Sequence, residues 1–276
     1  MIVHHLNCAT QCVIGGRLVS GEGSLFQRAP LVSHCLLLET NSGLVLVDTG
    51  LGMQDIENAS KRLGKGFLVL ARPRLDPEQT ALRQVERLGF SRNDVRHIIV
   101  THLDLDHAGG LCDFPAAQVH LLDLEYTAAT VPTSFIDRYR YRTIQWQHRP
   151  LWVRYLVQGE RWFGFECVRQ MSGLPPEILL VPLIGHTRGH AGVAVYAQGK
   201  WLFHAGDAYY YRGEMEPDSR FCPLGLMLVQ RLGAVDKQAF SWNQERLCQL
   251  RREHNREVSI FSAHDPIEFE RFPAVR

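Results

Sequence analysis

The sequence predicts a mixed α/β fold in one domain that spans residues 1–276. Short apolar runs recur along the chain, and several of them end in loops that are rich in histidine and aspartate. Amphipathic stretches with helix-start signals lie between these runs. The chain has 276 residues, 45% of them hydrophobic, which is enough for one large core of ordinary composition.

The first predicted elements are two strands at residues 34–39 and 44–48. They flank the tripeptide Asn-Ser-Gly at 41–43, whose residue types favour a tight turn, so the two strands should form a hairpin. A helix is predicted to begin at Asp76, which can cap it, with Pro77 in its first turn.

Gly89 should end that helix, and the next strand is predicted at 95–100. The remaining predictions alternate in the same way along the chain. Strands are expected at 118–122, 178–181, 193–196, 201–203 and 258–262, and helices at 123–130 and 236–254. This alternation supports the α/β class.

The most informative stretch follows the predicted strand at 95–100. It reads Thr-His-Leu-Asp-Leu-Asp-His-Ala-Gly-Gly and contains His102, Asp104, Asp106 and His107. Imidazoles and carboxylates this close together are costly to bury unless they share a cation. The stretch therefore predicts a metal site rather than a polar surface turn.

Three later strand ends supply further candidate ligands. Gly-His-Thr-Arg-Gly-His holds His186 and His190, His-Ala-Gly-Asp ends in Asp207, and Ser-Ala-His-Asp contains His264. Loops at strand ends, held by a rigid sheet, are common places for functional sites. We expect these loops to meet the first one.

The order H-x-D-x-D-H, G-H-T-x-G-H, G-D and A-H resembles the metallo-β-lactamase superfamily, whose pattern is H-x-H-x-D-H, His, Asp and His. The Val-Asp-Thr-Gly that contains Asp48 matches another strand end of that superfamily. The likeness runs from about 33 to 268. It implies a four-layer αββα sandwich, here with a helical insertion.

The resemblance implies two divalent metal ions. The first would be held by His102, Asp104 and His186, the second by Asp106, His107 and His264, with Asp207 bridging both. It also implies that Asp48 orients the histidines without binding metal and that His190 supports the ligands.

Asp104 is a departure, because the superfamily usually has histidine there. A carboxylate is a harder ligand than imidazole, so it shifts the preference from zinc toward iron or manganese. Zinc remains the expected metal, with iron and manganese as alternatives.

Within the superfamily, the chain resembles the quorum-quenching N-acyl-homoserine lactonases. Asp-Ala-Tyr-Tyr places Tyr210 three residues after Asp207, where those lactonases have a tyrosine near the lactone carbonyl. The resemblance implies a metallo-hydrolase in which a metal-activated hydroxide opens a lactone or related ester. Asp106 would pass a proton to the leaving group, and Tyr210 would either stabilise the oxyanion or only pack beside the cleft.

Three other functions stay open. The same metal pair could clamp a phosphoryl group in a phosphoesterase, or serve a thioesterase of the glyoxalase II kind. The third alternative is a non-catalytic metal-binding sensor or a di-iron protein. The chain lacks a flavin motif that would deliver electrons to a di-iron site.

A segment near 132–170 stands apart because basic and aromatic residues alternate between 135 and 165. It could be a lid over the site, a helical hairpin packed on the sandwich, or, least favoured, a surface that stacks on single-stranded nucleic acid. Binding of nucleic acid is also disfavoured by the net charge of +1.

The compartment and partners follow from what the sequence lacks. Residues 1–7 have neither the basic start nor the apolar stretch of a signal peptide, and no run is long enough to span a membrane. The seven cysteines are scattered without a C-x-x-C pair. We expect a cytoplasmic protein with reduced thiols, a small-molecule ester or lactone as partner, and either a monomer or a homodimer.

Overall fold

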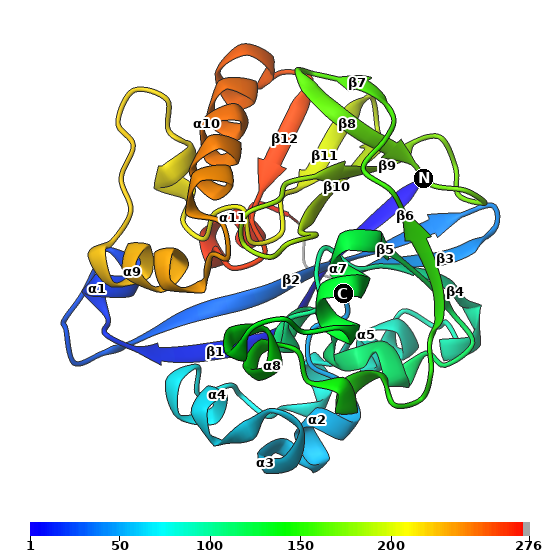
Figure 1. Ribbon diagram of the computed structural model, residues 1–276, viewed down its shortest axis with the longest axis horizontal. Coiled ribbons are helices and arrows are strands. Elements are labelled where there is room, and N and C mark those ends of the chain that lie inside the picture. The colour runs from blue at the N-terminus through cyan, green and yellow to red at the C-terminus, as the bar shows by residue number, and fades with distance from the viewer. Residues whose placement is uncertain (273–276) are drawn as a thin grey trace.

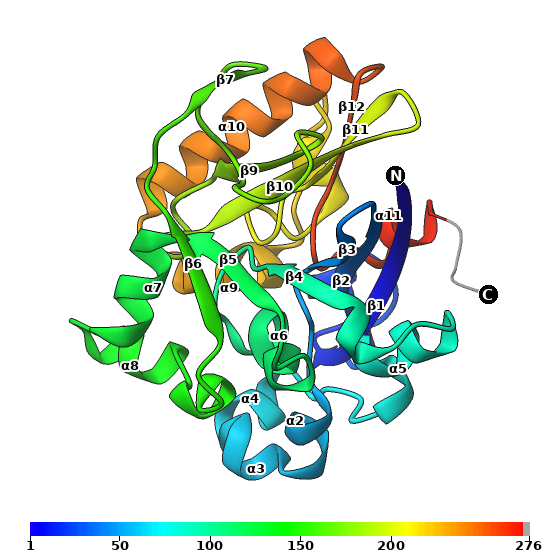
Figure 2. The ribbon, with the colours of Figure 1, turned by 90° about the vertical axis from the view of Figure 1, so that its right-hand side faces the viewer.

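The computed structural model describes residues 1–272, with the backbone alone for Phe135 and for residues 166–170. Two six-stranded sheets pack face to face, and helices cover their outer faces (Figures 1 and 2). The predicted α/β class and the four-layer arrangement are confirmed.

The first sheet has the order β1-β2-β3-β4-β5-β6. Its strands are β1 (Ile2–Ile14), β2 (Arg28–Thr40), β3 (Gly43–Val47), β4 (Val95–Ile99), β5 (Gln118–Leu122) and β6 (Leu151–Tyr155). The long hairpin of β1 and β2 is antiparallel, and β3 to β6 run parallel. The carboxyl ends of the parallel strands therefore lie along one edge.

The second sheet has the order β12-β11-β10-β9-β8-β7. Its strands are β7 (Glu160–Trp162), β8 (Phe165–Gln170), β9 (Ile178–Pro182), β10 (Ala191–Ala197), β11 (Lys200–His204) and β12 (Val258–Phe261). Since β10 is antiparallel to both β9 and β11, and β12 is parallel to β11, the strands β9, β11 and β12 end at the same edge.

The core follows from the two-residue repeat of the strands. On β2, Leu36 and Leu38 point between the sheets and join Val193 and Val195 of β10. Leu37 points the other way, into a layer beneath the helices of the first sheet. Both faces of a strand are thus apolar, which explains why the strands read as continuous hydrophobic runs.

The helices are mostly short. They are α1 (Arg17–Ser20), α2 (Met53–Glu57), α3 (Ala59–Arg62), α4 (Gly64–Leu70), α5 (Ala81–Arg87), α6 (Leu105–Ala108), α7 (Asp123–Thr130), α8 (Phe135–Arg140), α9 (Leu224–Gly233), α10 (Lys237–His254) and α11 (Pro266–Glu270). The long α10 begins after its cap Asp236, as predicted, and packs Leu247 and Leu250 on the second sheet. Figure 2 shows α10 on the opposite side of the sandwich from α5 and α6.

The predicted helix start at Asp76 was wrong for the α-helix. Asp76 caps a short 3-10 helix, Pro77–Gln79, by accepting a hydrogen bond from the Glu78 amide. The α-helix begins later, because Thr80 is extended and its hydroxyl accepts from the Arg83 amide. Two capping residues compete in this stretch, and the second one starts α5.

The segment 132–170 is helical only in its first part. After α8 and the 3-10 helix Thr143–Trp146, it forms β6 at the edge of the first sheet and β7 and β8 in the second. Five of its aromatic side chains are buried: Tyr141, Trp146, Tyr155, Trp162 and Phe165. These rings pack inside the sandwich and do not form an exposed stacking surface.

The structure also describes the cysteines and the apolar character of the helices. Six cysteines whose side chains are described carry free thiols. Among the helices of residues 1–272, none combines the length and the apolar character needed to cross a membrane.

The connection after β3 is fixed by a buried ion pair. Arg62 Nε lies 2.6 Å from Asp55 Oδ1, and both side chains are almost inaccessible to solvent. The other oxygen of Asp55 approaches Gly109 so closely that an added Cβ would lie 2.1 Å from it. The pair therefore packs directly against the loop that follows His107.

We predict that Arg62→Ala lowers the free energy of unfolding by about 3 kcal/mol, because it leaves the Asp55 carboxylate buried without its partner. The control Arg87→Ala removes an exposed ion pair with Glu78 and should cost less than about 1 kcal/mol. Urea unfolding of both variants measures the difference. Equal shifts in the two midpoints would contradict this assignment.

Candidate metal centre

The sandwich brings four loops together at the edge where its strands end. The loop after β4 carries His102 and Asp104, and α6, which follows it, carries Asp106 and His107. The loops after β9, β11 and β12 carry His186, Asp207 and His264. The four histidines and Asp207 are all at most 3% exposed, whereas the Asp104 and Asp106 side chains are 18% and 11% exposed. Solvent therefore reaches the cluster from the side of these two carboxylates.

Asp207 lies at the middle of the cluster, and both of its oxygens lie near imidazole nitrogens. Oδ1 lies 3.2 Å from His107 Nε2 and 3.1 Å from His264 Nε2. Oδ2 lies 3.5 Å from His186 Nε2 and 3.8 Å from His102 Nε2, and it is also 3.3 Å from His264 Nε2. One carboxylate thus faces two pairs of imidazoles, with His264 near both of its oxygens.

The seven predicted ligands all come together here. His102, His186 and Asp207 form one group whose ligand atoms lie within 4.8 Å of one another, and Asp106, His107 and His264 form a second such group. Asp104 lies beside the first group, with Oδ2 at 3.0 Å from His186 Nε2 and 3.5 Å from His102 Nε2.

The donor set fits divalent metal ions. Among the described residues, His102 Nε2, His107 Nε2 and Asp207 Oδ1 are buried and have no hydrogen-bond partner, although all three point into the cluster. Buried polar atoms of this kind are costly unless something else satisfies them. Imidazole nitrogens and carboxylate oxygens are common ligands of zinc, and a bound cation would satisfy all three atoms.

For His107 and His264, the other ring nitrogen lies against a fixed oxygen atom. His107 Nδ1 is 2.8 Å from Asp48 Oδ2, and His264 Nδ1 is 2.7 Å from the carbonyl of Val32. Asp48 also accepts from the amide and the hydroxyl of Thr101. It has a φ of 56°, a left-handed conformation that aspartate adopts more readily than most residues. These contacts orient the histidines, as metal sites generally require.

His190 lies outside both groups and supports the loops instead. Its Nε2 accepts a hydrogen bond from the Asp207 amide at 2.9 Å, and its Nδ1 lies 2.9 Å from the carbonyl of Leu183. Both ring nitrogens of His190 are thus engaged in hydrogen bonds with main-chain groups.

Charge is distributed unevenly over the cluster. Burial alone would raise the pKa of Asp207, but His264, His107 and His102 hold it well below its ordinary value. Burial would lower the pKa of His107, yet Asp207, Asp48 and Asp106 raise it well above the usual range. The pKa of His264 is also raised, against the effect of burial, chiefly by Asp207. Asp207 thus favours the protonated forms of His107 and His264, and these histidines favour the ionised form of Asp207.

Two further side chains reach the cluster from its open side. Tyr210 is half-buried, and its hydroxyl donates to Asp207 Oδ2 at 2.8 Å. Gln11, near the end of β1, donates from its amide to Asp106 Oδ2. Gln11 was not predicted, because nothing in its surrounding sequence marks it as part of a site.

Glu125 on α7 connects the two ligand loops. It is fully buried, and its Oε1 accepts from the Leu103 amide at 2.9 Å. Oε2 accepts from the Thr187 hydroxyl at 2.6 Å and from the Gly189 amide at 3.0 Å. An added Cβ on Gly189 would lie 2.1 Å from the Glu125 amide nitrogen, so this approach depends on the glycine.

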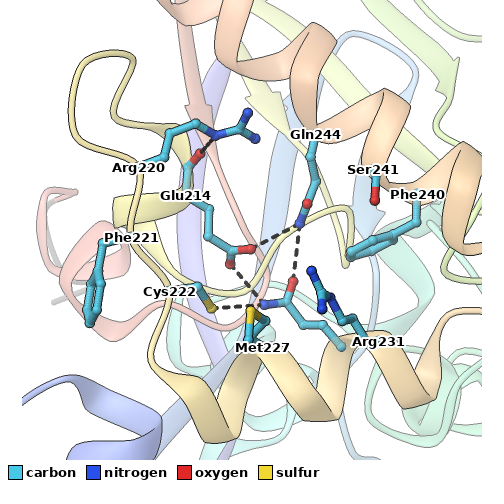
Figure 3. Close-up of a pocket in the computed structure, with 10 residues that line it drawn as sticks. Glu214, Arg220, Phe221, Cys222, Met227, Arg231, Phe240, Ser241 and Gln244 are labelled. Atoms are coloured by element: carbon cyan, nitrogen blue, oxygen red, sulfur yellow. Dashed lines mark hydrogen bonds between the residues drawn. The ribbon is translucent and has the colours of Figure 1, made fainter.

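A pocket of about 340 Å³ lies between α9 and α10 (Figure 3), and none of the candidate ligands lines it. Its lining includes Glu214, which accepts from the amides of Tyr210 and Tyr211 and from the side chains of Gln230 and Gln244. Burial raises the pKa of Glu214, although these donors oppose the shift. Glu214 fixes the backbone that presents Tyr210 to the cluster.

Residues 28–247 match the sequence model of the metallo-beta-lactamase superfamily. The chain belongs to this superfamily. A probable metallo-hydrolase of Mycobacterium tuberculosis is 41% identical over 265 residues, which cover 96% of this chain and 80% of that protein. The chain is an enzyme of the metallo-hydrolase type.

Lactonases are among its relatives. An N-acyl homoserine lactonase from a Bacillus species is 26% identical over 233 residues, or 82% of this chain and 85% of that protein. An N-acyl homoserine lactone hydrolase, solved with N-hexanoyl-L-homoserine at its catalytic metal centre, has a TM-score of 0.72 at 20% identity over 99% of this chain and 96% of that one. A dizinc quorum-quenching lactonase has a TM-score of 0.64 at 15% identity, over 96% and 87%. These structures share the fold.

We predict that Glu125→Ala destabilises the protein by about 3 kcal/mol or more, since it leaves the buried amides of Leu103 and Gly189 without acceptors. The same change should weaken metal retention, because both loops lose their common support. Urea unfolding and dialysis against a chelator measure the two effects. Glu86→Ala, at an exposed position of α5, is the control; a Glu125→Ala protein that matched it in both assays would contradict the assignment.

Proposed function

We propose that the chain is a binuclear metal-dependent hydrolase that opens a lactone or a related carboxylic ester. The arrangement of Asp207 between two pairs of imidazoles is the observation that supports this most directly. A single carboxylate with this placement is suited to bridge two cations.

The proposed ligands are those of the two groups together with Asp104. His102, Asp104 and His186 would hold the first metal, Asp106, His107 and His264 the second, and Asp207 both. We propose zinc, which accepts this mixture of nitrogen and oxygen ligands; Asp104 keeps iron and manganese as alternatives. When bound, the metals supply Lewis-acid polarisation of the substrate carbonyl and acidify a water molecule.

The chain's own residues would orient the substrate and deliver a proton to the leaving alcohol. Asp106 lies on the exposed side of the cluster, where Gln11 holds one of its oxygens, and from there it could pass a proton to the leaving alcohol. Tyr210 would turn its hydroxyl from Asp207 toward the oxygen that gains negative charge. We also propose that residues 1–276 form one domain. Of the segment near 132–170, α8 reaches the site through Arg140, while the later part forms strands of the two sheets.

The similarity to lactonases supports a carboxylic ester, and not a phosphoester, as the substrate. A phosphoesterase could use the arginines of the 132–170 segment to bind the phosphate group. Arg140, which lies beside the cluster, already donates to the carbonyls of His186 and Gly233. It therefore has little capacity left to bind a phosphate.

We predict about two metal ions per chain and hydrolysis in a screen of lactones, thioesters and phosphodiesters, with lactones or simple esters turned over fastest. His186→Ala should lose metal and activity together. Its matched control, His190→Ala, should lower stability because it disturbs the Asp207 amide, yet retain both metals. Elemental analysis and initial rates test this.

Two results would contradict the proposal. Full metal content in His186→Ala would show that the ligand set is wrong. Two bound metals without turnover of any ester would favour the metal-binding sensor.

We predict that metal uptake releases protons and becomes tighter as pH rises. The raised pKa values of His107 and His264 mean that the metal-free protein holds protons there, and a metal must displace them. Asp207, whose pKa is lowered, is already ionised and releases none. Calorimetric titration with Zn²⁺ in buffers of different ionisation enthalpy measures this; uptake near pH 7 without proton release would refute it.

A further inference from the structure

The guanidinium of Arg140, the last residue of α8, lies beside the metal centre and contacts three separate segments. Its Nε is 3.3 Å from Asp104 Oδ1, one terminal nitrogen donates to the carbonyl of His186 at 2.7 Å, and the other donates to the carbonyl of Gly233. The side chain is only 11% exposed. Arg140 thus joins the start of α6 to the His186 loop and to the end of α9.

Asp104 directs its two oxygens to opposite sides. Oδ1 faces Arg140, while Oδ2 faces His186 Nε2 and His102 Nε2. The carboxylate of an aspartate turns over a broad range about its last torsion angle, so an ion pair on one oxygen restricts where the other one points. The contact with Arg140 therefore aims Oδ2 at the first group of ligands.

The ion pair with Arg140 also compensates the negative charge of Asp104. Asp104 adds a negative charge where the superfamily pattern has a neutral imidazole, in a cluster that already contains Asp106 and Asp207. A guanidinium is always protonated in proteins, so Asp104 and Arg140 together bring no net charge.

We propose that Arg140 is a positioning residue for the first metal site. It orients the Asp104 carboxylate toward the first metal site and compensates its negative charge. The Asp104–Arg140 pair then has the same net charge as the neutral imidazole that the superfamily pattern has at this position. This inference rests on the proposed function, because it concerns the metal that Asp104 would help to hold.

The test is a double-mutant cycle on Zn²⁺ affinity, measured by competition with a chromophoric chelator. In the parent background, Arg140→Met should weaken the first site by about tenfold, because Asp104 is no longer aimed. In the Asp104→His background, the same change should strengthen that site by about fivefold, because it removes an unpaired positive charge beside the position of the cation. The control Arg138→Met, at an exposed position of the same helix, should change neither site.

This reversal of sign separates the proposal from a purely structural role. If Arg140 only tied the backbone at His186 and Gly233, its loss would weaken zinc binding in both backgrounds, and that result overturns the inference. Should Arg140→Met fail to fold, Arg140→Lys keeps the charge without the three-way contact. It should weaken binding in the parent and give no strengthening in the Asp104→His background; a strengthening there overturns the inference.

The cycle does not use turnover, so the two proposals fail in different ways. A parent chain that binds zinc at both sites, shows the reversal and hydrolyses no ester overturns the proposed function as a hydrolase and supports the role of Arg140. A parent that binds zinc and hydrolyses esters without the reversal overturns only the role of Arg140.

Discussion

The concentration of ionisable side chains at one edge of the sandwich is the constraint on which the site depends. Asp104, Asp106 and Asp207 lie among four imidazoles, and most of these groups are hidden from water. Buried charges of like sign repel and lose hydration, so each needs a partner at short range. Two rigid sheets that end at a common edge can hold such groups at fixed distances, which a flexible loop could not.

Three carboxylates of the site each have a specific partner that offsets the cost of burying their charge. Asp48 is held by Thr101 and His107, Asp104 faces Arg140, and Asp106 accepts from Gln11. Such interactions are strong in a poorly hydrated site. If one partner is removed, the carboxylate stays buried, and the protein loses the free energy that had compensated for its desolvation. The contacts around the ligands are therefore as necessary as the ligands themselves.

The sequence predicted which side chains come together in the cluster, because their information is local. His102, Asp104, Asp106 and His107 stand within six residues directly after an apolar strand, and the later histidines follow strands in the same way. The strands of the core could be found for the same reason, since each is a short apolar run between turns. The resemblance to a known superfamily then supplied the pairing of the two sheets.

The supporting residues could not be predicted, since their partners are remote in sequence. Gln11 is 95 positions from Asp106, and Arg140 reaches a carbonyl 93 positions away at Gly233. Glu125 lies within an ordinary helix start, where an acidic residue is expected near the positive end of the helix dipole in any case. The strands β6 to β8 were missed because basic residues interrupt their apolar pattern. Of these, β6 and β7 are edge strands, where such residues are tolerated.

Protons and metals are alternative solutions to the same electrostatic problem. The carboxylates that raise the pKa of His107 and of His264 favour a positive charge beside Asp207, which is also what a bound cation would supply. A divalent cation can replace these protons only where neutral imidazoles and ionised carboxylates already point at it. Because Asp207 is ionised in either case and its neighbours are fixed by Asp48 and Val32, the geometry that accepts the metal exists before the metal arrives. Little reorganisation is then needed on binding, and a site of this kind gains affinity from its rigidity as well as from its ligands.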